Sequence, residues 1–403
     1  MIKRKRKIKR TKVLGKINKY HNFTNIKKNK NKSRNYLYIK LICIIVFIIF
    51  LIYESKLNLT NIKDQIIYEN KYNDFELIKN RFNKDSFVFH YLEKITILNH
   101  TFNKNNMKLK KKKNNIHITV SFNNDYVYKL IVSMESVLSN CNKQKTFITY
   151  HVLCAPDVTE NSLIILKSFM KRYSLNLEMI FYNMGNNFKS FKNCRLSQST
   201  FYRLLLPIFI NSDRILHLDG DTLVYKDLSE VFQMDFNDNY IYGSLDYLSY
   251  DVDYLGINSN KYINAGVILM NLEKIRNDKK YYDLINITTK VELKLFDQAA
   301  INYVLYPKIG QLPFKFNVFT FYDQSDINRY IKSLRQNVNV TQIEEALYDP
   351  MIMHSVGGPK FWFKHSKRFD CNKKKDCSCN NYNCIWIYYA KKTDYYQEII
   401  SHI

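Results

Sequence analysis

Two kinds of apolar pattern alternate along the middle of the chain. Residues 116–120, 147–153 and 177–181 are short, mostly apolar runs of the kind found in buried strands. Between them, residues 126–138 and 162–173 carry apolar side chains at helical spacing. Strand alternating with helix predicts an α/β fold with a mostly parallel, doubly wound sheet. In such a sheet, ligands bind beyond the carboxyl ends of the strands.

A pair of carboxylates follows the next apolar run. Asp219 and Asp221 come directly after residues 214–218, with Gly220 between them. Two carboxylates one residue apart at the end of a buried strand can hold a divalent cation from one side and leave positions for a diphosphate. Because Asp and Gly are common in turns, the pair alone is weak evidence for a cation site. It becomes stronger evidence only if the rest of a nucleotide-diphosphate site is found elsewhere in the sequence.

Four further segments supply polar side chains and glycines to such a site: residues 121–126, 199–204, 263–272 with 296–301, and 354–362. In this order and spacing, the five segments resemble the donor-binding segments of glycosyltransferase family 8. That family includes glycogenin and the bacterial lipopolysaccharide galactosyl- and glucosyltransferases. The resemblance covers about residues 117–363 and implies a GT-A, Rossmann-like domain that uses a UDP-sugar.

The resemblance implies a metal site beside the diphosphate. Asp219, Asp221 and His354 would bind the cation, and two carboxylates with one imidazole suit Mn²⁺ better than Ca²⁺, with Mg²⁺ as the alternative. The cation would stabilise the charge that develops on the leaving diphosphate. Gly357 would let backbone N–H groups approach phosphate, and Lys360 would add a positive charge.

The resemblance also implies contacts with the donor and a reacting face. Arg203 would lie near the phosphates, Asp297 would hold the sugar or the acceptor, and Gln298 would lie near the anomeric carbon. The resemblance implies that the anomeric configuration is retained. Because the amide of Gln298 is a poor nucleophile, a front-face route is expected rather than a covalent intermediate. The remaining donor-binding positions that match the family are Ser121, Asn123, Asp125, Tyr126, Asp246, Asn264, Ala265 and Gly266.

Several of these residues have alternative interpretations. Without the resemblance, Arg203 could equally be a surface residue, His354 a polar loop residue, and Asp246 a cap at a strand end. Two positions depart from the family pattern: Asn123 stands where an acid is frequent, and Ala299 where some members have another Asp. An amide at 123 can still hydrogen-bond uracil, on whose ring Tyr126 is expected to pack.

A basic and then apolar stretch precedes the α/β region. Residues 1–35 hold fifteen Lys or Arg and no acid, and residues 36–53 contain the uninterrupted apolar run 41–52. This predicts a single-pass, type II signal anchor with the arm cytoplasmic, a stem over 54–115, and a lumenal catalytic domain over 116–366, in the Golgi or endoplasmic reticulum. A cleaved signal peptide is disfavoured by the long basic arm and by the lack of a small-x-small cleavage site. A buried core helix is disfavoured because the residues around the apolar run lack the alternating pattern of a globular domain.

The positive charge does not indicate a nucleic-acid binder. The formal net charge is +26, and all but about +10 of it comes from the N-terminal arm and anchor. A basic arm before an apolar segment is better explained by membrane topology. Two rivals remain: a non-catalytic UDP-sugar- or glycan-binding protein, and a phosphohydrolase, for which the further metal ligands of a two-metal site are lacking.

The C-terminal extension, residues 367–403, is rich in cysteine and aromatic residues. In an oxidising compartment its cysteines are expected to form disulfides rather than a zinc site, and the sequence does not indicate their pairing. These cysteines are Cys371, Cys377, Cys379 and Cys384. The aromatic end is predicted to fold back on the domain or to form part of an acceptor surface, and Trp362 to pack the preceding loop. The acceptor itself, whether glycan, lipid-linked or protein, is not indicated. Beyond the anchor, four glycosylation sequons are permissive only: Asn58, Asn99, Asn286 and Asn339.

Overall fold

The structure is a computed structural model of the full chain. It describes residues 45, 48–49, 74–84, 86–102, 110, 113–173, 176–188, 198–246, 253–290, 293–334, 339–357, 359–363 and 382–402. The predicted arm and nearly all of the predicted anchor lie outside these residues, as do Cys371, Cys377 and Cys379. Among the described residues, no helix is both long and apolar enough to cross a membrane. The chain divides into two units, residues 1–66 and 67–403, and the second contains everything described below.

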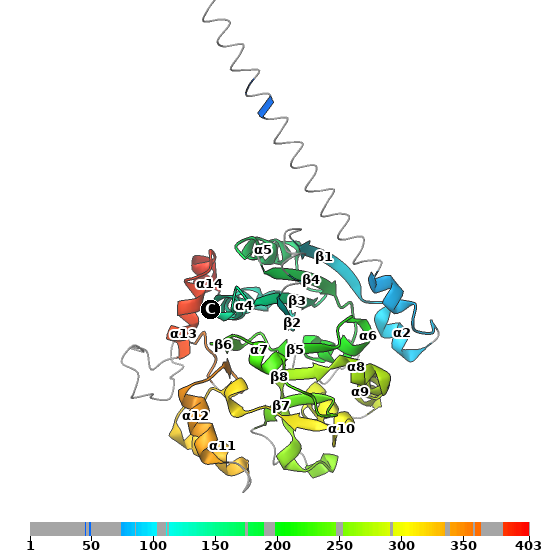
Figure 1. Ribbon diagram of the computed structural model, residues 1–403, viewed down its shortest axis with the longest axis vertical. Helices are drawn as coiled ribbons and strands as arrows, with labels where there is room; N and C mark the ends of the chain where they lie inside the picture. The colour runs from blue at the N-terminus through cyan, green and yellow to red at the C-terminus, as the bar shows by residue number, and fades with distance from the viewer. Residues whose placement is uncertain are drawn as a thin grey trace, which may run out of the picture. The chain divides into compact units, whose positions relative to one another are not determined.

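Strands and helices alternate through this second unit (Figure 1). The strands are β1 (Thr96–Phe102), β2 (Asn114–Phe122), β3 (Thr146–Cys154), β4 (Leu177–Asn183), β5 (Arg214–Leu218), β6 (Thr222–Val224), β7 (Ile241–Leu245), β8 (Ile263–Asn271), β9 (Ile309–Gln311), β10 (Val318–Phe319) and β11 (Ile352–His354). The α-helices are α2 (Phe87–Leu92), α4 (Val127–Asn140), α5 (Glu160–Lys171), α6 (Leu206–Phe209), α7 (Ser229–Phe232), α8 (Leu272–Asn277), α9 (Lys280–Lys290), α10 (Phe296–Leu305), α11 (Gln324–Ser333), α12 (Val340–Tyr348), α13 (Tyr382–Ala390) and α14 (Tyr396–Ser401). The 3₁₀ turns used below are η1 (Asn124–Tyr126), η2 (Gln198–Leu205) and η6 (Phe314–Phe316).

The main sheet has eight strands in the order β1-β4-β3-β2-β5-β8-β7-β9. Strands β4, β3, β2 and β5 run parallel to one another, as the alternating pattern predicts, and β9 is parallel to β7. Strand β8 is antiparallel to both of its neighbours, and β1 is antiparallel to β4. A small second sheet, β10-β11-β6, lies beside the end of β5. The expectation of an α/β fold with a mostly parallel sheet is confirmed.

Helices cover both faces of the main sheet. Successive strand residues point to opposite faces, so Leu216 of β5 belongs to the apolar cluster that includes α4, α5 and α13, and Ile215 to the cluster that includes α6, α8, α9 and α10. All nine residues of β3 are buried, as expected for a strand that is covered on both faces. Both clusters close over the sheet and leave its carboxyl-terminal edge as the place for a site.

The segment before β2 belongs to the fold. Residues 74–79 are helical, and β1 pairs with β4 along the edge of the sheet. Phe75, Val88, Leu92 and Ile95 are all buried in the second cluster. The prediction of a spacer over the whole of 54–115 is therefore wrong for residues 74–102. Their apolar side chains are distributed over elements too short to show a sustained period in a Lys- and Asn-rich background.

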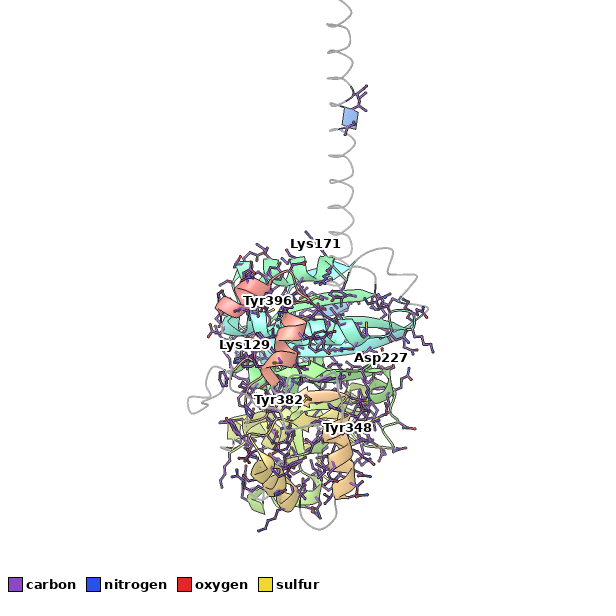
Figure 2. The ribbon with its side chains drawn as sticks, turned by 90° about the vertical axis from the view of Figure 1, so that its left-hand side faces the viewer. Lys129, Lys171, Asp227, Tyr348, Tyr382 and Tyr396 are labelled. Carbon is purple, nitrogen blue, oxygen red and sulfur yellow. The ribbon has the colours of Figure 1, made fainter. Side chains whose placement is uncertain are left out.

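The described part of the C-terminal extension folds back on the domain. Tyr382, Trp386 and Tyr389 of α13 are buried, and the Tyr389 hydroxyl donates to the carbonyl of Val224 in β6 at 3.2 Å. Helix α14 also contacts α4, and Figure 2 shows the helices of Tyr382 and Tyr396 on the same side of the molecule. Of the two predicted roles for this segment, folding back is confirmed.

Candidate active site

One cavity of about 620 Å³ gathers the predicted site residues where β2 and β5 end and β8 begins. Fifteen of the sixteen predicted residues line it, and only Asp125 does not. Asp125 is exposed in η1, and its backbone carbonyl accepts from the Lys129 ammonium. A larger cavity of about 890 Å³, lined by residues around η6 and α12, contains none of the predicted residues.

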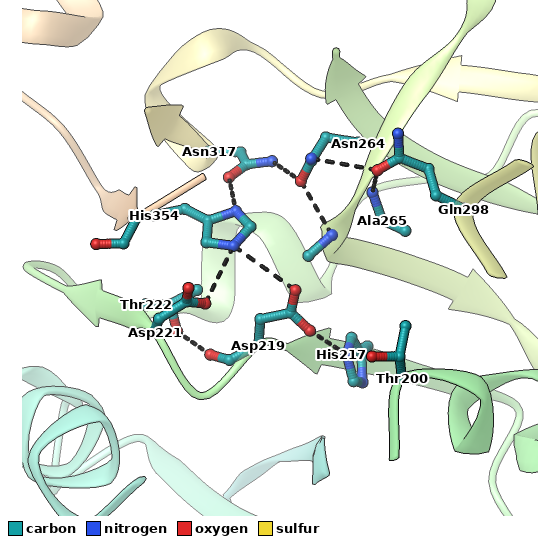
Figure 3. A network of polar contacts seen from close by, with 12 residues as sticks. Thr200, His217, Asp219, Asp221, Thr222, Asn264, Ala265, Gln298, Asn317 and His354 are labelled. Atoms are coloured by element: carbon teal, nitrogen blue, oxygen red, sulfur yellow. Dashed lines mark hydrogen bonds and ion pairs between the residues drawn. The ribbon is translucent and has the colours of Figure 1, made fainter. Parts of the chain in front are cut away.

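Asp219, Asp221 and His354 form a cluster with the composition of a metal site. One ligand atom from each lies within 4.8 Å of the other two. His354 Nε2 is 3.6 Å from Asp219 Oδ2 and 3.3 Å from Asp221 Oδ1 (Figure 3). Strand pairing creates the cluster, because β11 is antiparallel to β6 and places His354 opposite Thr222, the residue after the carboxylate pair. The spacing fits a divalent cation held by two carboxylates and one imidazole.

The second oxygen of each carboxylate is held by a neighbouring side chain. Asp219 Oδ1 accepts from Arg203 Nη2 at 2.7 Å and from His217 Nε2 at 3.1 Å. Asp221 Oδ2 accepts from Lys360 Nζ at 2.6 Å. Both carboxylates therefore turn their remaining oxygens toward the imidazole. Hydrogen bonds of this kind orient metal ligands in proteins.

The same neighbours keep the carboxylates ionised. Burial alone raises a carboxyl pKa, but the Arg203 guanidinium holds the pKa of Asp219 well below its usual range. At Asp221, His354 and Lys360 likewise outweigh burial and lower the pKa. Burial lowers the pKa of His217 to about 4, so its ring is neutral at pH 7 and donates Nε2–H to Asp219. The cluster is thus negatively charged at neutral pH, as a cation site requires.

Gly266 forms the floor of the cluster. A Cβ at this position would lie 2.0 Å from His354 Cε1 and 2.7 Å from Asp219 Oδ2. The Gly266 carbonyl also accepts from the backbone N–H of Asp219 at 2.8 Å. Only glycine lets β8 approach Asp219 and His354 this closely, and this close approach explains why position 266 is a glycine.

A network of amides and one carboxylate forms the opposite side of the cavity. Asn264 Nδ2 and Gln298 Nε2 each donate to Asp246 Oδ2 at 2.9 Å. Gln298 Oε1 accepts from the backbone N–H of Ala265 at 3.0 Å. Strand β8 and the first turn of α10 therefore present these side chains as one connected polar surface, and Asp246 is a member of it rather than a strand-end cap.

Arg203 joins the two sides of the cavity. It is only 4% exposed, which contradicts the surface alternative, and its guanidinium reaches Asp219, Asp297 and the Ala265 carbonyl. Arg203 Nε lies 3.1 Å from Asp297 Oδ2 but directs its hydrogen to the Thr200 carbonyl. Among the described residues, none donates a hydrogen bond to Asp297 Oδ2. Burial raises the pKa of Asp297 to about 7, even though Arg203 opposes the shift.

Comparison with known proteins decides the family. A model of the family described as glycosyl transferase family 8 matches residues 117–366. The chain belongs to glycosyl transferase family 8. It is 21% identical to general stress protein A of Bacillus subtilis over 62% of this chain and 89% of that protein. It is 25% identical to a lipopolysaccharide 1,2-glucosyltransferase of Escherichia coli over 50% of this chain and 62% of that protein.

Solved structures confirm the fold of the family 8 domain. The crystal structure of an active-site mutant of LgtC superposes with a TM-score of 0.54 at 22% identity, over 69% of this chain and 96% of that chain. The GT-A-like α/β architecture is thereby confirmed. Helices α13 and α14 lie beyond the residues that the family model matches, as do β1 and α2.

Aromatic side chains pack the end of the family 8 cavity where the nucleotide is expected, which is called the nucleotide end below. Tyr126 meets Trp362 edge to face at 5.9 Å between ring centroids, and Trp362 lies 6.4 Å from Trp386 of α13. The Lys129 ammonium is 5.0 Å from the Tyr126 ring and 5.4 Å from the Trp362 ring. The prediction that Trp362 packs its own loop is confirmed, and α13 extends that packing.

Three contributors to the site were missed by sequence reasoning. His217 lies two residues before Asp219, and strand alternation could have placed both on one face. Asn302 Oδ1 accepts from Ile263 N at 2.8 Å and its Nδ2 donates to the Ile263 carbonyl, which ties β8 to α10. Asn317 lies between η6 and β10, and no motif marks it. It contacts His354 only because β10 and β11 pair.

Proposed function

We propose that this chain is a retaining glycosyltransferase that moves a hexose from a UDP-sugar to a glycan, lipid-linked or protein acceptor, with Mn²⁺ as the preferred cation and Mg²⁺ as the alternative. One observation carries the proposal. The cluster of Asp219, Asp221 and His354 faces the Asp246–Asn264–Gln298 network across a single cavity. A hexose donor is supported by the name of the E. coli relative, a glucosyltransferase, and glucose or galactose are the first candidates.

In the proposed reaction, the bond between sugar C1 and the diphosphate oxygen breaks, the acceptor hydroxyl oxygen bonds to C1 and loses its proton, and UDP leaves. A divalent cation at the three ligands would neutralise charge on the leaving diphosphate. Lys360 reaches Asp221 at 2.6 Å and adds positive charge at the same edge. Asp297 lines the cavity beside Arg203 and would hold a sugar or acceptor hydroxyl.

Gln298 is suited to orient the sugar rather than to attack it. Its Oε1 already accepts from Ala265 N at 3.0 Å and from Asn264 Nδ2 at 3.3 Å. An amide oxygen held by two donors is a still weaker nucleophile than a free amide. This supports a front-face route, in which the leaving phosphate takes the acceptor proton, over a covalent intermediate on Gln298.

The same proposal includes a membrane-anchored, lumenal protein. Residues 36–53 would form a type II signal anchor behind a cytoplasmic basic arm, and the family 8 domain would work in the Golgi or endoplasmic reticulum. Sequence pattern alone supports this part. Protease protection of an epitope at the C-terminus in sealed microsomes tests it, since a cytoplasmic domain would be digested.

The function is tested by measuring UDP release from a panel of UDP-sugars by the purified full chain, with Mn²⁺ or with a chelator. Slow hydrolysis of one donor only with the cation is the expected result, and it names the sugar without knowledge of the acceptor. Release of inorganic phosphate would favour a phosphohydrolase instead. No turnover of any donor by a chain that still binds UDP would favour a non-catalytic binding protein.

A further inference from the structure

A continuous hydrogen-bonded chain connects the metal-ligand cluster with the sugar side of the cavity (Figure 3). It runs from His354 through Asn317 and Asn264 to Gln298. His354 Nδ1 lies 3.1 Å from Asn317 Oδ1, Asn317 Nδ2 lies 3.0 Å from Asn264 Oδ1, and Asn264 Nδ2 lies 3.3 Å from Gln298 Oε1. All four side chains line or adjoin the cavity, and Asn317 is only 1% exposed.

Two backbone N–H groups of β8 determine the direction of every hydrogen bond in this chain. A backbone N–H can only donate, so the Asn264 atom 3.0 Å from Gly266 N must be its oxygen. The Asn317 atom that faces this oxygen must then be the NH₂ group, which places Asn317 Oδ1 against His354. By the same reasoning, Ala265 N requires the oxygen of Gln298 to face β8.

This direction selects one tautomer of His354. Because Asn317 presents an acceptor, His354 Nδ1 must carry a hydrogen, so that in the neutral ring Nε2 is the nitrogen with the lone pair. Nε2 is the atom that lies 3.3 Å from Asp221 Oδ1 and 3.6 Å from Asp219 Oδ2. A neutral imidazole binds a metal through a nitrogen whose lone pair is free, and the hydrogen bond at the other nitrogen decides which one that is.

We propose that Asn317 is a positioning residue that holds His354 in its metal-binding tautomer and, through Asn264, ties the metal-ligand cluster to Gln298 as one rigid polar unit. The proposal rests on the metal-dependent function proposed above. Asn317 touches neither the expected metal position nor the donor face directly. Its two functional groups have separable roles, since the oxygen orients His354 and the NH₂ group orients Asn264.

Two substitutions separate these roles. Asn317→Asp keeps an oxygen for His354 Nδ1–H but places a carboxylate oxygen against Asn264 Oδ1. Asn317→Leu has a similar volume and removes both hydrogen bonds. We expect Mn²⁺ alone to bind Asn317→Asp within about threefold of wild type and Asn317→Leu about 10–100-fold more weakly. Both variants should lose kcat for UDP-sugar hydrolysis, because in each Asn264 Oδ1 loses the hydrogen bond that Asn317 donates to it.

The tautomer can be measured in the wild-type chain. In the full chain labelled with ¹⁵N-histidine and free of metal, the neutral form of the His354 ring should carry its hydrogen on Nδ1, with assignment by comparison with His354→Gln. This measurement decides the matter even if Asn317→Leu fails to fold. Circular dichroism and thermal unfolding identify that case.

An Nε2–H tautomer, or equal Mn²⁺ affinity for wild type and a folded Asn317→Leu, would overturn the proposal. Asn317→Asp with unchanged kcat would overturn the link to Gln298. If wild type itself does not bind Mn²⁺ or Mg²⁺, the proposed function fails instead, and the ¹⁵N spectrum still shows whether Asn317 sets the tautomer.

Discussion

The two ends of the cavity are held in place by different forces. At the metal end, Asp219 and His354 are held by hydrogen bonds and charges, over a glycine floor that a single methyl group would obstruct. At the nucleotide end, Tyr126 is held by packing against Trp362, which in turn packs on Trp386. Hydrogen bonds fix direction as well as distance, whereas ring packing tolerates small shifts. Substitutions at the metal end should therefore change chemistry, and those at the nucleotide end should mainly change donor affinity.

The largest effect is expected for Asp221→Asn. The substitution removes half of the carboxylate pair but keeps its shape, so the fold should survive while turnover falls by on the order of 10³-fold. UDP release with Mn²⁺ measures it. Asp349→Asn, a surface carboxylate paired with Lys226, is the matched control and should leave turnover unchanged. Normal turnover in Asp221→Asn would rule out the metal assignment.

Gly266→Ala tests how sharply the floor of the metal end is defined. The new methyl group would need the space of His354 Cε1, at 2.0 Å, so the imidazole and Asp219 must move apart. We expect Mn²⁺ affinity to fall by about 10–100-fold, measured by titration of the metal alone. If the folded variant binds Mn²⁺ with wild-type affinity, the cluster of Asp219, Asp221 and His354 can rearrange more easily than its hydrogen bonds indicate.

Asp297→Asn tests, through the pH dependence of stability, whether burial raises the pKa of Asp297. Burial raises the pKa of Asp297 from 3.8 to about 7, so the folded state holds this proton more tightly than the unfolded state. Its contribution to stability is therefore present below pH 3.8 and is lost as the pH rises to about 7. Urea unfolding of both proteins across this range should show the variant gaining stability relative to wild type up to pH 7, and constant differences above it. Parallel pH profiles would contradict the raised pKa.

The smallest effect is expected at the nucleotide end. Trp386→Leu removes one ring from the packing behind Trp362 and Tyr126, and an aromatic pair contributes about 0.5–1.5 kcal/mol. The Kd for UDP should rise a few-fold, with kcat nearly unchanged. Tyr388→Leu is the control on the same helix, because its side chain is 56% exposed. A large fall in kcat for Trp386→Leu would show that this end also orients the reacting groups.

Features encoded within one short segment could be predicted from the sequence, and features that depend on contacts between distant segments could not. The strand–helix alternation, the carboxylate pair after β5 and the residues of β8 and α10 were all predicted, because each is encoded within one short segment. Asn317 was not, since it meets His354 only through strand pairing, and β1 and α2 were not, since their apolar residues lack a sustained period. The packing of Trp386 on Trp362 was not predicted either, because it joins two segments that are separated along the chain and no local sequence pattern links them.

UDP binding with and without Mn²⁺ tests the central claim most directly, in wild type and in Asp221→Asn. If Asp219, Asp221 and His354 hold a divalent cation for the diphosphate, Mn²⁺ should strengthen UDP binding to the wild-type chain by about tenfold or more, equivalent to ~1.4 kcal/mol. The variant should show no such gain. Equal UDP affinity in Mn²⁺ and in chelator, or the same gain in Asp221→Asn, would contradict the account.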